Sequence, residues 1–186
     1  MGRRDLKFDR SGLRAPLYMA AGATVFVLTG RVLFAITDTR LLINVTPSVP
    51  VGLYLARTSS GHDCRRGEIV AFLPRDGIAN LIRERNWLPE GVPIVKKVGA
   101  VAGDQYCVNA GQMTVNGRPV GAVSVVDSAG RPLPQIRGCH RVNSGEFLPV
   151  GDIDRSFDGR YMGAQPISSI AAVLTPLWLH GGDGQR

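Results

Sequence analysis

The sequence contains no internal repeat, heptad pattern or low-complexity tract, which excludes repeat architectures and coiled coils. Its three cysteines lack the C-x-x-C spacing of zinc and redox sites. His62, His140 and His180 show no spacing to a candidate nucleophile, so we interpret them as surface or structural residues. A length of 186 residues allows one domain with a core but leaves little room for a second.

The positive charge of the chain is concentrated at its start. The formal net charge is +7, and residues 1–14 alone hold five basic and two acidic side chains. No basic patch interleaved with aromatic residues is present, so we expect no nucleic acid partner. A strong, salt-dependent affinity of the remaining domain for DNA would revive that interpretation.

An apolar run from Leu17 to Ile36 follows, with Arg31 as its only charge, and as a helix it would reach about 30 Å. The basic residues before it predict a cytoplasmic N-terminus by the positive-inside rule. We therefore expect a cytoplasmic tail over 1–14, a transmembrane anchor in the inner membrane over 15–36 and a periplasmic domain over 37–186. A cleavable secretory signal is the alternative, although no good Ala-x-Ala site closes the run.

The remainder predicts a mainly β fold with mixed-β organisation. Short apolar runs separated by Gly, Pro and Asn predict strands at 68–73, 94–101, 105–108, 113–115 and 168–178. Asn116-Gly117 predicts a type I′ hairpin turn, and apolar spacing predicts one helix over Gly77–Arg85. In an oxidising compartment Cys107 and Cys139 are candidates to pair; three unpaired thiols are the alternative.

Two segments hold candidate catalytic side chains. In Thr46-Pro47-Ser48-Val49-Pro50 the prolines stiffen a turn around two hydroxyls, close after the apolar run. Taken alone, such a segment is usually only a loop. Lys96 and Lys97 lie in an apolar strand, where alternation lets only one of them point inward. Burial would lower its pKa and make it a usable base, whereas an edge strand protected by lysines is the other interpretation.

A third segment, Asp154-x-Ser156-x-Asp158-Gly159, matches the first half of an EF-hand calcium loop. The match fails at the twelfth position, where Gln165 cannot supply a bidentate carboxylate. We therefore expect no metal and no cofactor.

Four motifs, in this order, resemble the signal peptidase family that uses a Ser/Lys dyad, and most closely its conjugative transfer branch, TraF. They are Ser48-Val49-Pro50 followed by Gly52-Leu53-Tyr54, then GEIVAF at 67–72, KKVGAVAGD at 96–104 and GDIDRSFDGR at 151–160. Val49, Ala102 and Gly159 depart from the motifs of general leader peptidases. The first of these departures, after the nucleophile, is similar to the TraF branch. A general leader peptidase, which would process many precursors, is the rival within the enzyme class.

The resemblance implies a signal peptidase-like catalytic domain in which Ser48 is the nucleophile and Lys96 the general base. It further implies an oxyanion hole made by the Ser48 amide and the Thr46 hydroxyl, with Ser156 orienting Lys96 and with Asp158 and Arg160 supporting its strand. The implied partners are a membrane-tethered precursor, the propilin of a conjugative system, together with the lipid bilayer and the transfer machinery. The product is either hydrolysed or cyclised. A non-catalytic, membrane-tethered component of such a machine is the alternative.

Overall fold

The computed structural model describes residues 39–58 and 64–180. The predicted basic tail and anchor, residues 1–36, lie outside the described residues. Within the described ranges, no helix combines the length and the apolar character needed to cross a membrane. The described residues from Arg40 onward belong to one compact unit. It holds all the elements described below except Thr39, the first residue of β1.

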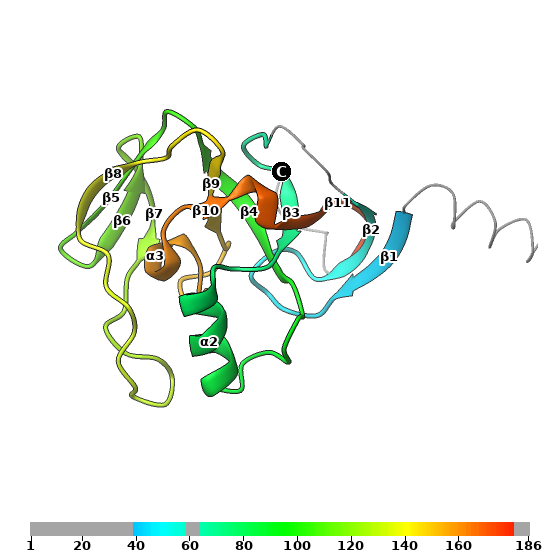
Figure 1. The fold of residues 1–186 in the computed structure, drawn as a ribbon, viewed down its shortest axis with the longest axis horizontal. Helices are drawn as coiled ribbons and strands as arrows, with labels where there is room; N and C mark the ends of the chain where they lie inside the picture. Colours follow the sequence, from blue (N-terminus) through cyan, green and yellow to red (C-terminus); the bar gives the residue numbers. More distant parts are fainter. Residues whose placement is uncertain (1–38, 59–63, 181–186) are drawn as a thin grey trace, which may run out of the picture. The chain divides into compact units, whose positions relative to one another are not determined.

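A seven-stranded sheet forms the larger part of this unit (Figure 1). In spatial order its strands are β1 (Thr39–Asn44), β2 (Gly52–Thr58), β11 (Ile170–Leu179), β3 (Ile69–Phe72), β4 (Ile94–Val101), β9 (Glu146–Val150) and β10 (Gln165–Pro166). Strands β3 and β9 contribute Phe72 and Phe147, whose rings meet edge to face at 5.2 Å between centroids in the main hydrophobic core. The sheet therefore provides a rigid support for the β4 and β9 side chains.

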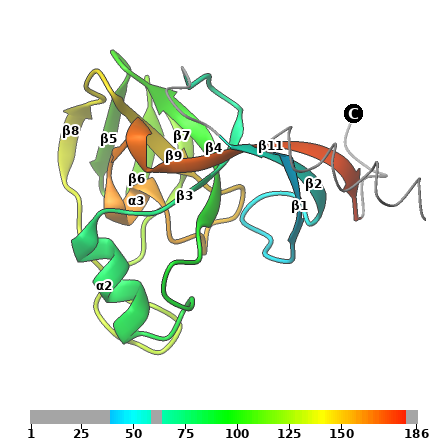
Figure 2. The ribbon, with the colours of Figure 1, turned by 45° about the vertical axis from the view of Figure 1, so that its right-hand side comes forward.

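A second, four-stranded sheet has the order β7 (Arg118–Ala122), β6 (Gln112–Val115), β5 (Gln105–Asn109) and β8 (Gly138–Arg141). Asn116 and Gly117, with φ of 48° and 77°, connect β6 to β7 as the type I′ turn requires. Cys107 and Cys139 face each other across β5 and β8 and form a disulfide, which confirms the predicted pairing. In Figures 1 and 2 this sheet lies at the opposite end of the unit from β1.

Two short helices complete the described fold: α2 (Asp76–Glu84) and α3 (Gly159–Met162). A 3₁₀ turn, η1 (Ile167–Ser169), precedes β11. Of the α2 residues only Ile82 is buried, so the helix lies on the surface of the core. Arg85, just after α2, pairs with Asp127 at 3.0 Å and thereby ties the helix to the long connection between β7 and β8.

The mainly β class is confirmed, as are the predicted strands at β3, β4, β5, β6 and β11 and the helix at α2, within one or two residues. No strand was predicted at β1, β2, β8, β9 or β10 and no helix at α3, whereas β7 is the second strand of the hairpin that Asn116-Gly117 predicts. Pro119 lies in β7 and Pro149 in β9, and a proline normally argues against a strand because it cannot donate to a ladder. Strand β8 is too exposed to show an apolar alternation.

Candidate active site

Strand β4 buries Lys96 and exposes Lys97, as the alternation of side chains predicts. Lys96 is only 4% exposed, whereas the Lys97 side chain is 38% exposed and pairs with Asp152 at 2.6 Å. Burial lowers the pKa of Lys96 to about 8, with the nearby charge of Asp158 raising it and that of Arg160 lowering it further. Lys96 is therefore an amine that loses its proton at a lower pH than an ordinary lysine, near pH 8.

The Ser48 loop is organised by Asn44, a nearly buried residue at the end of β1. The Asn44 amide nitrogen donates to the carbonyls of Thr46, Val49 and Pro50, at 2.8, 3.2 and 3.2 Å. Tyr54 Oη donates to the same Pro50 carbonyl at 2.5 Å. These bonds fix the backbone on both sides of Ser48, which is itself half-buried.

Gly151, just after β9, lies where the Ser48 loop meets the segment that carries Ser156. A Cβ placed on Gly151 would lie 2.0 Å from Ser156 Oγ and 3.2 Å from the Ser48 carbonyl oxygen. The next residue, Asp152, donates its amide to that carbonyl at 2.8 Å. Only a glycine leaves room for these two segments to approach so closely.

Ser156 is 2% exposed, and its hydroxyl finds no hydrogen-bond partner within the described part of the chain. An unmade hydrogen bond of a buried group costs about 1–3 kcal/mol. The Ser156 hydroxyl, beside Gly151, can therefore form a hydrogen bond with a group that approaches it during a reaction.

Asp158 and Arg160 form the polar centre of the turn between β9 and α3. The Asp158 carboxylate accepts from the Gly151 amide at 2.7 Å and from Arg160 Nη2 at 2.9 Å. Arg160 also donates to the carbonyls of Ala122, Ile153 and Asp154. The pair therefore holds the 151–160 segment together and ties it to Ala122 at the end of β7.

The register of β4 against β9 places Lys97 opposite Val150, so Lys96 lies next to the level of Gly151. Gly151 is thus the point near which the Ser48 loop, Ser156 and the Lys96 strand converge. A hydrogen bond between Ser48 Oγ and Lys96 Nζ is not among those formed in the described residues. Catalytic hydrogen bonds are often long in unliganded enzymes and tighten when substrate binds.

Comparison with known proteins decides the family. A model of the family "Signal peptidase, peptidase S26" matches residues 14–178. The chain belongs to the signal peptidase family. Two relatives, both named plasmid transfer protein TraF and both from Escherichia coli, are 33% identical to it over 146 residues. The alignments cover 73% of this chain and 81% and 80% of the two relatives.

The hydroxyl of Thr46 is already hydrogen-bonded to Asn44 in the structure. Thr46 Oγ1 donates to Asn44 Oδ1 at 2.8 Å, and the Thr46 amide donates to the same oxygen at 3.2 Å. To donate to an oxyanion, the hydroxyl would have to exchange its bond to Asn44 for one to the substrate.

The segment from Asp154 to Gln165, whose sequence matches the first half of a calcium loop, is organised around Arg160. The Asp158 carboxylate accepts from Arg160, and the Gln165 side chain is completely buried, where it bonds the backbone of Arg75 and Met162. Across residues 39–58 and 64–180, no cluster of three His, Cys, Asp or Glu side chains could hold a metal.

Three supporting residues were missed by the sequence analysis: Asn44, Gly151 and Asp152. Gly151 and Asp152 begin the GDIDRSFDGR motif, so they could have been found by asking why that motif starts with glycine. Asn44 carries no motif signal, because its role depends on folding the loop back over its side chain.

Proposed function

We propose that the chain is a serine endopeptidase in which Ser48 is the nucleophile and Lys96 the general base. The observation that carries this proposal is the burial of Lys96, which lowers its pKa to about 8. At pH 7 roughly a tenth of such an amine is neutral, compared with well under a thousandth for an ordinary lysine. The base therefore exists in the required form at physiological pH.

In the proposed mechanism Ser48 Oγ attacks the scissile carbonyl while Lys96 Nζ accepts the hydroxyl proton. The lysine then returns this proton to the leaving amine as the acyl-enzyme ester forms. The oxyanion is stabilised by the Ser48 amide and by the Thr46 hydroxyl after it has left Asn44. Loss of one such donor typically costs about 2.7–4 kcal/mol.

Ser156 is proposed to orient the neutral amine, because its buried hydroxyl is otherwise unused among the described residues. If Ser156 Oγ accepts an N–H of the neutral Lys96 amine, the single lone pair of that amine stays free to face Ser48. Asp158 and Arg160 act indirectly: they hold the Gly151 amide and the turn that carries Ser156. They are positioning residues, since they hold the turn in place.

The substrate we propose is an exported precursor of a conjugative transfer system, the propilin. The support is the name of the two relatives, plasmid transfer protein TraF, together with the matched share of both chains. Water would release the acyl-enzyme as a carboxylic acid. The N-terminal amine of the same precursor would instead release a cyclic product, which is one water molecule lighter.

We further propose that residues 15–36 anchor the chain in the inner membrane and that the catalytic domain is periplasmic. Support comes from the disulfide, because such bonds persist in oxidising compartments. It also comes from exposed apolar side chains near β1, where the anchor would join the domain. Leu41, Ile43 and Val45 are 55%, 72% and 76% exposed, and Trp178 on β11 is 61% exposed. Such a patch suits contact with lipid.

The test is the intact mass of the cognate precursor co-expressed with the wild-type chain, Ser48→Ala or Lys96→Ala. We expect processing by the wild type and a loss of about a thousandfold or more in each variant. A product one water lighter than the hydrolysed form identifies cyclisation. Ser128→Ala, at an exposed loop tip, is the matched serine control and should process normally.

Unchanged processing by Ser48→Ala or by Lys96→Ala would overturn the dyad. If conjugation itself also survived Ser48→Ala, the chain would be a non-catalytic component of the apparatus. Processing of many unrelated exported precursors would favour a general leader peptidase over a dedicated one.

A further inference from the structure

The side chain of Asn44 is bonded to the backbone on both sides of Ser48, in the loop between β1 and β2 (Figure 1). Its nitrogen donates to the carbonyl of Thr46, before the serine, and to those of Val49 and Pro50, after it. Its oxygen accepts from the amide and from the hydroxyl of Thr46. Since all of these partner groups lie in the loop, the Asn44 side chain serves to hold this loop on the end of β1.

The contacts of Asn44 require a carboxamide. The group has two N–H donors and a carbonyl acceptor, and Asn44 uses both kinds. Its two hydrogens face three carbonyls, so the nitrogen is fully used, and with 4% of the residue exposed little water can replace it. An aspartate would lack the donors, an alanine would lack both kinds of group, and a glutamine would place them one methylene too far from β1.

Other contacts keep the loop attached to the domain without Asn44. Val49 is completely buried, the Ser48 carbonyl accepts from the Asp152 amide at 2.8 Å, and the Pro50 carbonyl also accepts from Tyr54 Oη at 2.5 Å. Removal of the Asn44 side chain should therefore change the orientation of groups within the loop while the fold persists. The effect of Asn44 is local to the nucleophile.

The Ser48 amide, one of the two proposed oxyanion donors, has no acceptor among the described residues. This N–H belongs to the peptide unit between Pro47 and Ser48. The unit before it is held by Asn44 through the Thr46 carbonyl, and the unit after it by the Asp152 amide through the Ser48 carbonyl. The direction of the unused N–H is thus fixed before a substrate arrives, as a preorganised donor requires.

The Thr46 hydroxyl, the other proposed donor, shares its acceptor with the Thr46 amide. Both donate to Asn44 Oδ1, the hydroxyl at 2.8 Å and the amide at 3.2 Å. When the hydroxyl turns toward an oxyanion, Oδ1 keeps the amide, so the loop stays in place and no buried acceptor is left unpaired. A hydrogen bond to a charged oxygen is stronger than one to a neutral amide, which favours this exchange as charge develops.

We propose that Asn44 is a positioning residue for the oxyanion hole: it aligns the Ser48 amide and the Thr46 hydroxyl for the transition state. The inference rests on the proposed function, because it takes Ser48 as the nucleophile. Asn44 acts through these two donors and does not itself touch the substrate. Interactions that form only in the transition state change kcat, whereas those already present in the bound substrate change KM.

The kinetic test uses the full-length chain and a peptide spanning the cleavage site that the co-expression experiment defines. Asn44→Ala should lower kcat about tenfold to a hundredfold and leave KM within about threefold. Asn44→Gln, which keeps the carboxamide, should recover part of this loss. Thr46→Val should cost about a hundredfold in the wild-type background and clearly less in the Asn44→Ala background, where the hydroxyl is no longer aligned.

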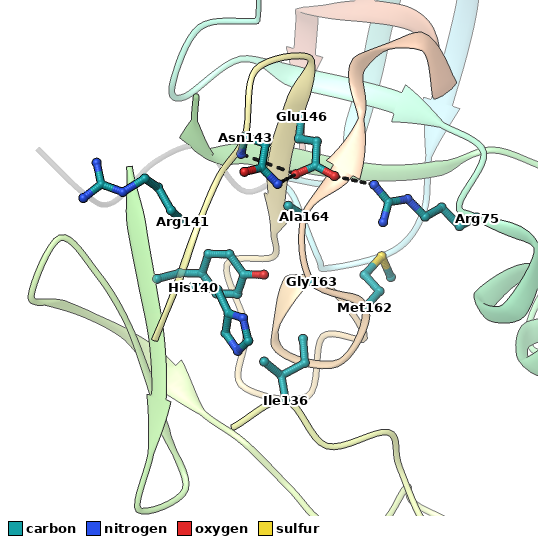
Figure 3. Close-up of a pocket in the computed structure, with 10 residues that line it drawn as sticks. Arg75, Ile136, His140, Arg141, Asn143, Glu146, Met162, Gly163 and Ala164 are labelled. Carbon is teal, nitrogen blue, oxygen red and sulfur yellow. Dashed lines mark hydrogen bonds and ion pairs between the residues drawn. The ribbon is translucent and has the colours of Figure 1, made fainter. Parts of the chain in front are cut away.

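A matched asparagine serves as the control. Asn143 lines a recess formed by β5, β8, β9 and the segment after α3 (Figure 3), where its side-chain amide donates to Glu146 at 3.0 Å. Asn143→Ala should leave kcat and KM unchanged. Hydrogen exchange gives a readout that needs no activity: in Asn44→Ala the Thr46 amide should exchange faster, because it has lost its acceptor, whereas the β4 amides should keep their rates.

An unchanged kcat in Asn44→Ala, a rise in KM alone, or fully additive losses in the double variant would each overturn the inference. If Asn44→Ala does not fold, Asn44→Asp decides, because it keeps an acceptor for Thr46 and removes the donors; a normal kcat in that variant would overturn the inference as well. Failure of the dyad would appear differently, as processing retained by Ser48→Ala. An inactive Ser48→Ala beside a fully active Asn44→Ala would contradict the role of Asn44 alone.

Discussion

The Asp158 carboxylate and the Arg160 guanidinium form an ion pair at 2.9 Å in which neither side chain is exposed to solvent. Each group is almost fully hydrogen-bonded, since Asp158 also accepts from the Gly151 amide and Arg160 donates to three backbone carbonyls. This pair joins the turn before α3 to β7 of the second sheet. It therefore couples the geometry near Lys96 to the fold as a whole.

Breaking this pair from one side should destabilise the protein strongly. Asp158→Asn leaves the buried Arg160 without its counter-charge, and such losses cost about 3–5 kcal/mol. Chemical denaturation measures the change in the free energy of unfolding. Arg131→Gln is the control, because it removes a partly exposed ion pair to Asp127 and should cost much less than Asp158→Asn. Equal effects of the two substitutions would contradict this account.

Peptidase activity should rise with pH through the titration of Lys96. The proposed base acts only when neutral, and burial lowers its pKa to about 8, so kcat/KM should increase up to about pH 8 and then level off. A pH–rate profile with a peptide containing the cleavage site measures this. A profile that is flat between pH 6 and 9 would indicate that Lys96 does not supply the limiting proton transfer.

The same burial should make stability depend on pH. In the unfolded chain Lys96 regains its ordinary pKa of 10.5, so the unfolded state binds more protons between about pH 8 and 10.5. The cost of burying the charged amine, roughly 3 kcal/mol, is complete below about pH 8 and is relieved as pH rises to 10.5. Lys96→Met should be more stable than the wild type at pH 7, and the difference should shrink in that window. Parallel pH–stability curves would refute this prediction.

Adding one methyl group at Gly151 should strongly reduce activity. Its Cβ would lie 2.0 Å from Ser156 Oγ and 3.2 Å from the Ser48 carbonyl, so Gly151→Ala forces the two segments apart. We expect a loss of at least about a hundredfold in kcat, since small displacements of reacting groups have such effects. Gly77→Ala is the matched control: the site in α2 has no atom within 4 Å, and alanine there should stabilise the helix by about 0.5–1 kcal/mol. Retained activity in Gly151→Ala would show that these segments need not approach so closely.

Removing the disulfide should loosen β8 and lower stability. The bond closes a loop with a sequence separation of 32 residues, for which chain entropy predicts about 3–4 kcal/mol. In urea denaturation, the double variant Cys107→Ser, Cys139→Ser should have a free energy of unfolding that is lower by this amount. Its β8 amides should exchange faster with solvent. Cys64→Ser leaves the disulfide intact and serves as the control. Unchanged exchange in β8 would mean that its ladder to β5 is sufficient by itself.

The sequence by itself determined the elements whose pattern is local. Strand β4 was predicted at its observed bounds because IVKKVGAV is rich in Val and Ile and lies between Pro93 and Gly103. The Asn116-Gly117 turn was predicted because few residue pairs tolerate positive φ. Helix α2 followed from its apolar spacing. Alternation along β4 required one lysine to point inward, and the motifs identified Lys96 as the candidate.

Only the tertiary structure decided which side chains meet. Gly151 became important because β9 brings it between Ser48 and Ser156, and Asn44 because the loop folds back over its amide. The recess drawn in Figure 3 likewise joins residues from β5, β8, β9 and the segment after α3, which no spacing in the sequence connects. The physical reason is that periodicity records which face of an element is buried, whereas contacts between distant elements are set by how their backbones pack and pair.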